Sequence, residues 1–147
     1  MTTSPLTIRD LEDGDAPFIW SSWLRCWRRS QIFLGQHTSE REMRTTDWFA
    51  WARAGITRII EDPGVVVRVA CLAEVPDEVA GYVVARPAQG RLDWLFIREP
   101  YRRTGLARRL LGEVFPVPPA QLTISYLTPH AVSIKHSGKI ELRYIPA

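Results

Sequence analysis

The feature that most limits the possible folds is a block of three apolar segments with very short connections. Val65–Ala73, Val79–Arg86 and Arg91–Arg98 are rich in Val, Leu, Ile and aromatic residues, which are typical of strands. Turn-forming residues separate them, at Val75–Glu78 and Pro87–Gly90. Connections this short join antiparallel neighbours, because a parallel pair needs a crossover of a dozen or more residues. We therefore expect a three-stranded antiparallel meander at the centre of the fold.

Segments on either side of the meander show the helical period. Apolar residues recur at three- and four-residue steps from Ala16 to about Arg29 and from Asp47 to Ile60, which predicts two amphipathic helices. A third helix is expected from Gly105 to Phe115, where prolines follow. Further strands are expected at Leu6–Arg9, Leu122–Leu127 and within residues 137–146. The chain is thus predicted to form one α/β domain, residues 1–147, with a mixed, mainly antiparallel sheet flanked by helices.

Between the meander and the third helix, arginine is concentrated around a glycine. Arg102, Arg103, Arg108 and Arg109 surround Gly105. A helix begins with unpaired N–H groups, and together with the helix dipole these groups favour an anion. A glycine lacks the Cβ that would keep a ligand away from the backbone. The segment has neither a Gly-Lys-Ser/Thr phosphate loop nor the G-x-G-x-x-G dinucleotide pattern. We therefore predict that the turn binds the diphosphate of a ligand that uses neither of these two motifs.

Arg102-x-x-Gly105-x-Ala107 resembles the R/Q-x-x-G-x-G/A motif of the GCN5-related N-acetyltransferases (GNAT), over residues 5 to about 127. The resemblance implies a GNAT-like sheet with a V-shaped split between its fourth and fifth strands, 92–97 and 122–127. It implies acetyl-CoA, or another acyl-CoA, as the acyl donor and no metal. Backbone groups of Phe96 and Ile97 would bind the pantetheine arm. The loop that holds the pyrophosphate would consist of Arg102, Arg103, Thr104, Gly105, Leu106, Ala107 and Arg108.

Acyl transfer to an amine needs a group that removes a proton and a group that protonates the leaving thiolate. Asp93 lies in an otherwise apolar strand and is expected to share a face with residues 95 and 97, so it is the candidate base. Alternatively, Asp93 lies at the edge of the strand and binds water or an arginine. Tyr126 is the candidate acid, Tyr144 is a second, and His130 could serve as base or acid. The family's usual tyrosine lies in a later helix, which is not evident here.

The acceptor is an unidentified amine. In this family the first two helices form its wall, and here they carry tryptophan and arginine side chains that could stack on a base or sugar, or form core. These residues are Trp20, Trp23, Trp27, Arg28, Arg29, Trp48 and Trp51. The segment Ser22-Trp23-Leu24-Arg25 is also similar to compact GNAT-like proteins of bacteriophages. A CoA-binding module without catalysis and a nucleic-acid or protein binder remain alternatives, and a homodimer through the last strand is open.

The charge and cysteine content agree with these functions without selecting one. The net charge is +3, which would suit a phosphate-bearing ligand or a nucleic acid but also occurs on ordinary surfaces. Cys26 and Cys71 lie in apolar surroundings without a metal-ligand pattern, so reduced thiols are expected. The sequence contains no apolar run long enough to span a membrane and no secretory signal. A cytoplasmic protein with no membrane partner is the expectation.

Overall fold

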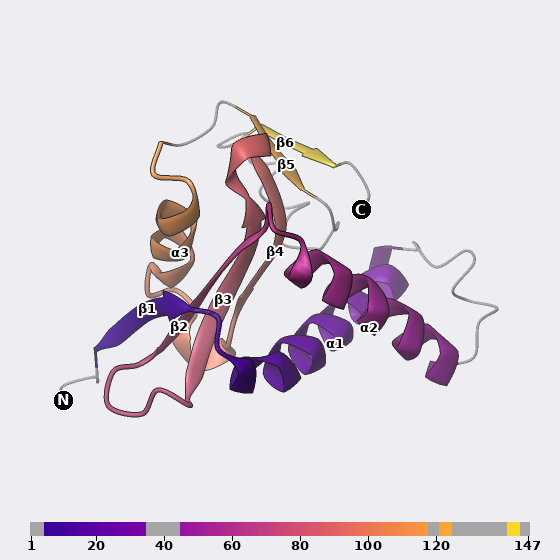
Figure 1. The fold of residues 1–147 in the computed structure, drawn as a ribbon, viewed down its shortest axis with the longest axis horizontal. Coiled ribbons are helices and arrows are strands. Elements are labelled where there is room, and N and C mark those ends of the chain that lie inside the picture. The colour runs from indigo at the N-terminus through magenta and orange to yellow at the C-terminus, as the bar shows by residue number, and fades with distance from the viewer. Residues whose placement is uncertain (1–4, 35–44, 118–120, 125–140, 145–147) are drawn as a thin grey trace.

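The computed structural model describes residues 5–34, 45–117, 121–124 and 141–144. Their strands form one six-stranded sheet with helices on both faces (Figure 1). The strands are β1 (Leu6–Asp10), β2 (Val66–Leu72), β3 (Val79–Arg86), β4 (Arg91–Ile97), β5 (Gln121–Ile124) and β6 (Glu141–Tyr144). The α-helices are α1 (Ala16–Leu34), α2 (Thr45–Glu61) and α3 (Leu106–Val114). Short 3-10 helices are η1 (Asp13–Asp15), η2 (Pro87–Gln89) and η3 (Glu99–Tyr101).

The sheet has the predicted mixed, mainly antiparallel topology. Its strands follow chain order, and the pairs from β1 to β4 are antiparallel, which confirms the meander. Strand β5 pairs with β4 in parallel, through only Arg91 with Thr123 and Leu92 with Ile124. Beyond Leu92, β4 pairs with no described residue of β5. The two strands thus form the V-shaped split of a GNAT-like fold.

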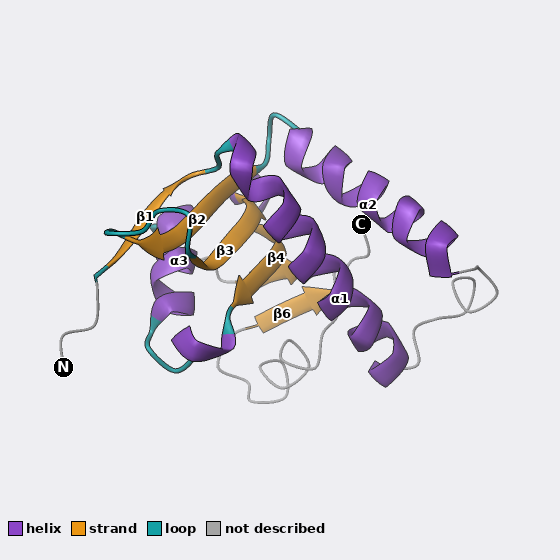
Figure 2. Ribbon diagram, turned by 90° about the horizontal axis from the view of Figure 1, so that it is seen from below, coloured by secondary structure: helices purple, strands orange, loops and turns teal. Residues whose placement is uncertain are grey.

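Each face of the sheet packs against different helices. Helices α1 and α2 lie over one face and α3 lies over the other (Figures 1 and 2). Under α1 and α2, Trp23 is fully buried and stacks on Trp94 of β4, with ring centroids 5.2 Å apart. Under α3, Leu106 and Leu110 pack into a separate apolar cluster. Among the described residues, no helix is both long and apolar enough to cross a membrane.

Strand β4 contains a bulge that changes its side-chain alternation. Val84 of β3 pairs with Trp94, but the next residue, Ala85, pairs with Leu92, so Asp93 is an extra residue. As a result, Leu92, Leu95 and Ile97 all pack against the cluster under α3. The expected face shared by residues 93, 95 and 97 therefore does not extend through Asp93. The bulge lies where the parallel pairing with β5 ends.

Candidate functional site

The turn after β4 exposes backbone at the start of α3. Arg103 and Gly105 both have left-handed conformations, with φ of 64° and 83°. Gly105 is the residue that precedes α3, and a Cβ built on it would meet no heavy atom within 4 Å. The space above this glycine is therefore open. The first N–H groups of an α-helix have no partner inside the helix, so they are available to an anion in that space.

Side chains of the turn hold this backbone in place. The Arg102 Nε donates a hydrogen bond to the carbonyl oxygen of Ile97 at 2.9 Å. The Thr104 hydroxyl donates to the carbonyl oxygen of Tyr101 at 2.6 Å. The predicted loop residues thus divide into two groups. Leu106 anchors the helix in the core, whereas Arg102, Arg103, Thr104, Gly105 and Arg108 are exposed, with Ala107 half-buried.

The bulge also decides which backbone groups of β4 are available. Arg98 N–H donates to the carbonyl oxygen of Ala80 on β3, at 2.8 Å. Because backbone direction repeats every two residues in an antiparallel pair, Phe96 faces β3 as well. A Cβ built on Gly81 would lie only 2.6 Å from the Phe96 carbonyl oxygen, which agrees with this direction. Of the two predicted pantetheine anchors, Ile97 therefore directs its backbone N–H and C=O away from β3, whereas Phe96 directs its own toward β3.

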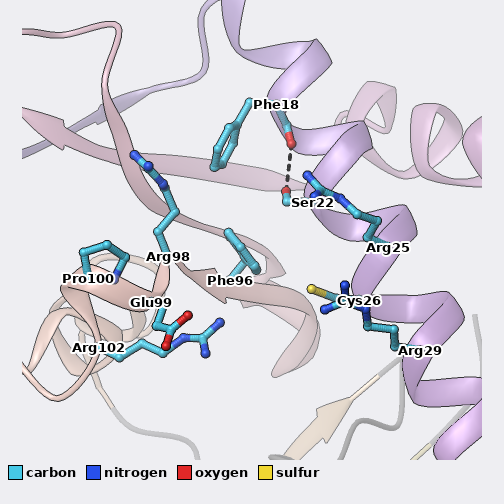
Figure 3. Close-up of a pocket in the computed structure, with 10 residues that line it drawn as sticks. All are labelled: Phe18, Ser22, Arg25, Cys26, Arg29, Phe96, Arg98, Glu99, Pro100 and Arg102. Atoms are coloured by element: carbon cyan, nitrogen blue, oxygen red, sulfur yellow. Dashed lines mark hydrogen bonds between the residues drawn. The ribbon is translucent and has the colours of Figure 1, made fainter.

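A pocket of about 330 Å³ lies between α1 and the end of β4 (Figure 3). Four of its ten lining residues are arginines, and one, Glu99, is acidic. One wall is a stripe of α1, at helical spacing, and the other wall is the end of β4 with the turn that follows. The wall on α1 consists of Phe18, Ser22, Arg25, Cys26 and Arg29, and the opposite wall of Phe96, Arg98, Glu99, Pro100 and Arg102.

On the α1 wall, neighbouring groups affect the thiol of Cys26 and the hydroxyl of Ser22. Burial raises the pKa of the Cys26 thiol, against the opposing effect of Arg29, Arg102 and Arg25. Figure 3 shows this thiol and the Arg102 guanidinium pointing toward each other across the pocket. The Ser22 hydroxyl is hydrogen-bonded to the Phe18 carbonyl oxygen at 2.8 Å. The α1 wall thus combines a protonated thiol with a serine whose hydroxyl is already bonded to its own helix.

Asp93 lies at the other end of β4 and does not line this pocket. It is only 2% exposed. Its carboxylate accepts a hydrogen bond from Arg86 Nε at 3.2 Å, and Arg91 Nε lies 3.5 Å away. These contacts agree with the alternative prediction, in which Asp93 binds an arginine. The carboxylate is shared by two guanidinium groups at the bulge.

The side chains of the other predicted catalytic residues lie outside the described part of the chain. Tyr126 and His130 lie outside the described residues. Tyr144 belongs to β6, but its side chain is not described. Within the described ranges, no group of three or more His, Cys, Asp or Glu side chains could hold a metal ion. Of the predicted site, the structure therefore describes the loop, the β4 edge and Asp93.

Most of the tryptophans expected in an acceptor wall belong to the packing of α1 and α2. Trp23 is core, as described above, and the ring of Trp20 lies under the guanidinium of Arg53, 4.0 Å away. Trp27 contacts Trp51, which is 45% exposed, with ring centroids 5.6 Å apart. The side chain of Trp48 is outside the described set. Of the expected wall residues that the structure describes, only Arg29 lines the pocket.

Several pocket residues were not predicted. Arg25 and Cys26 come from α1, while Arg98 and Glu99 follow β4, about seventy residues later in the sequence. A usable signal was the spacing of Ser22, Cys26 and Arg29, which places three polar or thiol side chains on one stripe of an amphipathic helix.

Comparison with known proteins agrees with this geometry. The chain resembles the apo form of YjaB from Escherichia coli, with a TM-score of 0.58 and 18% identity, over 90% of this chain and 80% of that chain. It also resembles AAC(6')-Iy in complex with a bisubstrate analog, with a TM-score of 0.55 and 13% identity, over 94% and 92% of the two chains. A GCN5-related N-acetyltransferase from Rhodopseudomonas palustris has a TM-score of 0.55 and 15% identity, over 94% and 82%.

These structural likenesses show a shared fold. Among curated proteins, none matches the chain in sequence. The model of the acetyltransferase (GNAT) family matches residues 17–118, which include α1, α2, the meander and α3. The chain therefore belongs to the acetyltransferase (GNAT) family.

Proposed function

We propose that the protein transfers an acetyl group from acetyl-CoA to the amine of an acceptor. The observation that carries the proposal is the open, left-handed turn at Gly105 beside the end of β4, which pairs with no described residue of β5. Membership of an acetyltransferase family supports the reaction class. The structural relative AAC(6')-Iy, an aminoglycoside N-acetyltransferase, binds CoA and a bisubstrate analog that contains CoA.

The diphosphate of CoA would lie on the amides from Arg103 to Arg108. Three features support this position. The amides at the start of α3 lack helical partners, Gly105 leaves open space, and exposed guanidinium groups of Arg102, Arg103 and Arg108 supply positive charge. A side chain at position 105 would occupy the space that the phosphates need.

The pantetheine arm would extend β4 on the side away from β3. Backbone direction assigns this role to Leu95 and Ile97, because the carbonyl oxygen of Phe96 faces β3. The carbonyl oxygen of Ile97 already accepts a hydrogen bond from Arg102. As far as the described residues go, that leaves the Ile97 N–H and both backbone groups of Leu95 for the ligand.

In the reaction, the neutral amine nitrogen attacks the thioester carbonyl carbon and forms the C–N bond. The C–S bond breaks, the nitrogen loses a proton, and the CoA sulfur leaves and takes up a proton. The products are an acetamide and free CoA. The roles of Asp93 as base and of Tyr126 or His130 as acid stay predictions. For Asp93, the two arginines at its carboxylate support a second role, in which it fixes the bulge.

Chemistry is tested by incubating the protein with acetyl-CoA and a panel of amines, and by quantifying free CoA and acetylated amine by chromatography and mass spectrometry. We expect equal amounts of the two products, formed only when the protein and an amine are present. CoA that stabilises the protein against heat without any acetylated product would instead identify a non-catalytic CoA-binding module. DNA binding that weakens steeply with salt, without CoA binding, would favour a nucleic-acid binder.

A further inference from the structure

The pocket beside α1 has an excess of positive charge. Four arginines and one glutamate line it. Arg98 has a partner, since its guanidinium lies 3.6 Å from the Glu78 carboxylate. The other three are Arg25, Arg29 and Arg102. Among the described residues, no carboxylate lies within 4.0 Å of their guanidinium nitrogens.

The hydrogen bonds of these arginines leave donors available. Arg25 donates to the backbone and hydroxyl oxygens of Ser21, at 3.3 and 3.0 Å, and both are neutral acceptors. Arg102 uses its Nε for the Ile97 carbonyl oxygen. Each guanidinium has five N–H donors, so most donors of Arg25 and Arg102 make no hydrogen bond to a described residue and remain for a ligand. A planar fork of this kind suits carboxylate and phosphate oxygens.

The three guanidinium groups are also close enough to Cys26 to influence the same thiol. Arg29, Arg102 and Arg25 each oppose the effect of burial on the pKa of the Cys26 thiol. Cys26 lies between Arg25 and Arg29 on α1, and the Arg102 guanidinium points toward it from the opposite wall (Figure 3). The positive charges of both walls therefore converge on the same space.

We propose that this pocket binds a carboxylate or phosphate group of the acceptor, with Arg25 and Arg29 as its principal ligands. The proposal rests on the proposed function and adds the class of acceptor, an amine that also carries an anionic group.

The position of the two arginines favours the acceptor over the phosphates of CoA. Arg25 and Arg29 belong to α1, which covers one face of the sheet, whereas the diphosphate turn leads into α3 on the other face (Figure 1). The side chain of Phe96 packs on the α1 side and lines the pocket. An acceptor entering from α1 would reach the thioester beside β4 with its anionic group in this pocket.

The turnover test compares amines that differ in charge. Phosphoethanolamine is compared with ethanolamine, glutamate with its diamide, and an aminoglycoside represents polycationic amines. We expect the anionic member of each pair to have the higher kcat/KM. Arg29→Gln and Arg25→Gln should raise KM for the anionic amine about tenfold, the effect of losing one charge-assisted hydrogen bond, with KM for acetyl-CoA unchanged. Arg58→Gln, an equal charge change on the exposed part of α2, should alter neither constant.

A second measurement does not depend on turnover. Cys26 lines the pocket and Cys71 is fully buried, so alkylation by iodoacetamide, located by mass spectrometry, should report on Cys26. Inorganic phosphate and glutamate should slow alkylation of the native protein, and Arg29→Gln should abolish this protection. Arg58→Gln should retain it.

The outcomes separate this proposal from the proposed function. Acetylation of neutral or polycationic amines as fast as anionic ones, with no protection of Cys26 by phosphate, would overturn the anion pocket and keep the acetyltransferase. Protection by phosphate with no acetylated amine would contradict the acetyltransferase and keep the anion site. An Arg29→Gln variant that weakens only acetyl-CoA would assign the arginines to the phosphates of CoA and overturn the acceptor assignment.

Discussion

Arginines at the two ends of strand β4 differ in their partners. At its start, Arg86 and Arg91 share the buried carboxylate of Asp93. Past its end, Arg25 and Arg29 line a pocket, and no described carboxylate lies within ion-pair distance of either. Removing either member of such a buried ion pair leaves the charge of the other member uncompensated. An exposed arginine without a carboxylate partner can be replaced at little cost to the fold and is available to bind a ligand.

The largest expected effect on stability is at the paired end. Asp93→Asn should lower the free energy of unfolding by about 3 kcal/mol, because two guanidinium groups lose their shared charge at the bulge. Arg29→Gln, in the pocket, should stay within about 0.5 kcal/mol of the native protein. Urea unfolding of the three proteins measures both values.

The opposite pattern for Asp93 would support its role as general base. In that case Asp93→Asn would unfold like the native protein, while kcat would fall by about a hundredfold or more. If the Asp93→Asn and Arg29→Gln variants were equally stable, the arginines near the two ends of β4 would not differ in their contribution to stability.

A second paired arginine sharpens the comparison through pH. Arg9 donates two hydrogen bonds to the buried Asp15 carboxylate, at 2.7 and 2.9 Å. Burial alone would raise the pKa of Asp15, but Arg9 and the backbone N–H of Glu12 lower it below the usual value. A folded-state pKa below the unfolded one gives stability that is present above the unfolded pKa and is lost as pH falls through the folded pKa.

Asp15→Asn should therefore cost about 2 kcal/mol at about pH 7, and the cost should shrink as the pH falls below the unfolded pKa of about 3.9 and then through the lower folded pKa. Urea unfolding across this range measures the difference between variant and native protein. Asp13→Asn removes an exposed carboxylate two residues earlier and should change the free energy of unfolding at about pH 7 by no more than about 0.5 kcal/mol. A constant cost for Asp15→Asn at every pH would show that its charge is not what stabilises the fold.

The smallest expected effect is at the turn itself, where Arg103 has a left-handed φ of 64°. A residue with a Cβ is strained there by about 1 kcal/mol, so Arg103→Gly should raise the free energy of unfolding by about 0.5 kcal/mol after the entropic cost of glycine. The same change at Arg108, inside α3, should lower it by about 1 kcal/mol. Thermal unfolding of both variants gives the signs, and a loss at position 103 would mean that the turn is not strained.

Local features of the sequence were enough to predict the meander and the turn at Gly105. Short connections can only join antiparallel neighbours. A glycine that precedes a helix within a run of arginines predicts a turn whose backbone a ligand can approach. Helix α1 is longer than predicted and continues to Leu34, past the expected end near Arg29. No strong stop signal follows Arg29, so the periodicity alone did not fix this end.

The bulge and the pocket could not be predicted in the same way. An extra residue at Asp93 depends on how β3 and β4 pair, and it changes which side chains and backbone groups of β4 face the ligand. The pocket needs Arg29 from α1 and Arg102 from the turn, which only the tertiary fold brings together. Sequence reasoning therefore found the proposed CoA loop and missed most of the proposed acceptor pocket.

The central claim is that the backbone at Gly105 holds the diphosphate of CoA, and calorimetric titration of CoA tests it most directly. Gly105→Glu is compared with Gly112→Glu, which adds the same charge to open space farther along α3. Both variants are first shown to be folded by circular dichroism. We predict that Gly105→Glu weakens CoA binding by more than about a hundredfold and that Gly112→Glu leaves it near the native value. Native-like affinity in the Gly105→Glu variant would contradict the account.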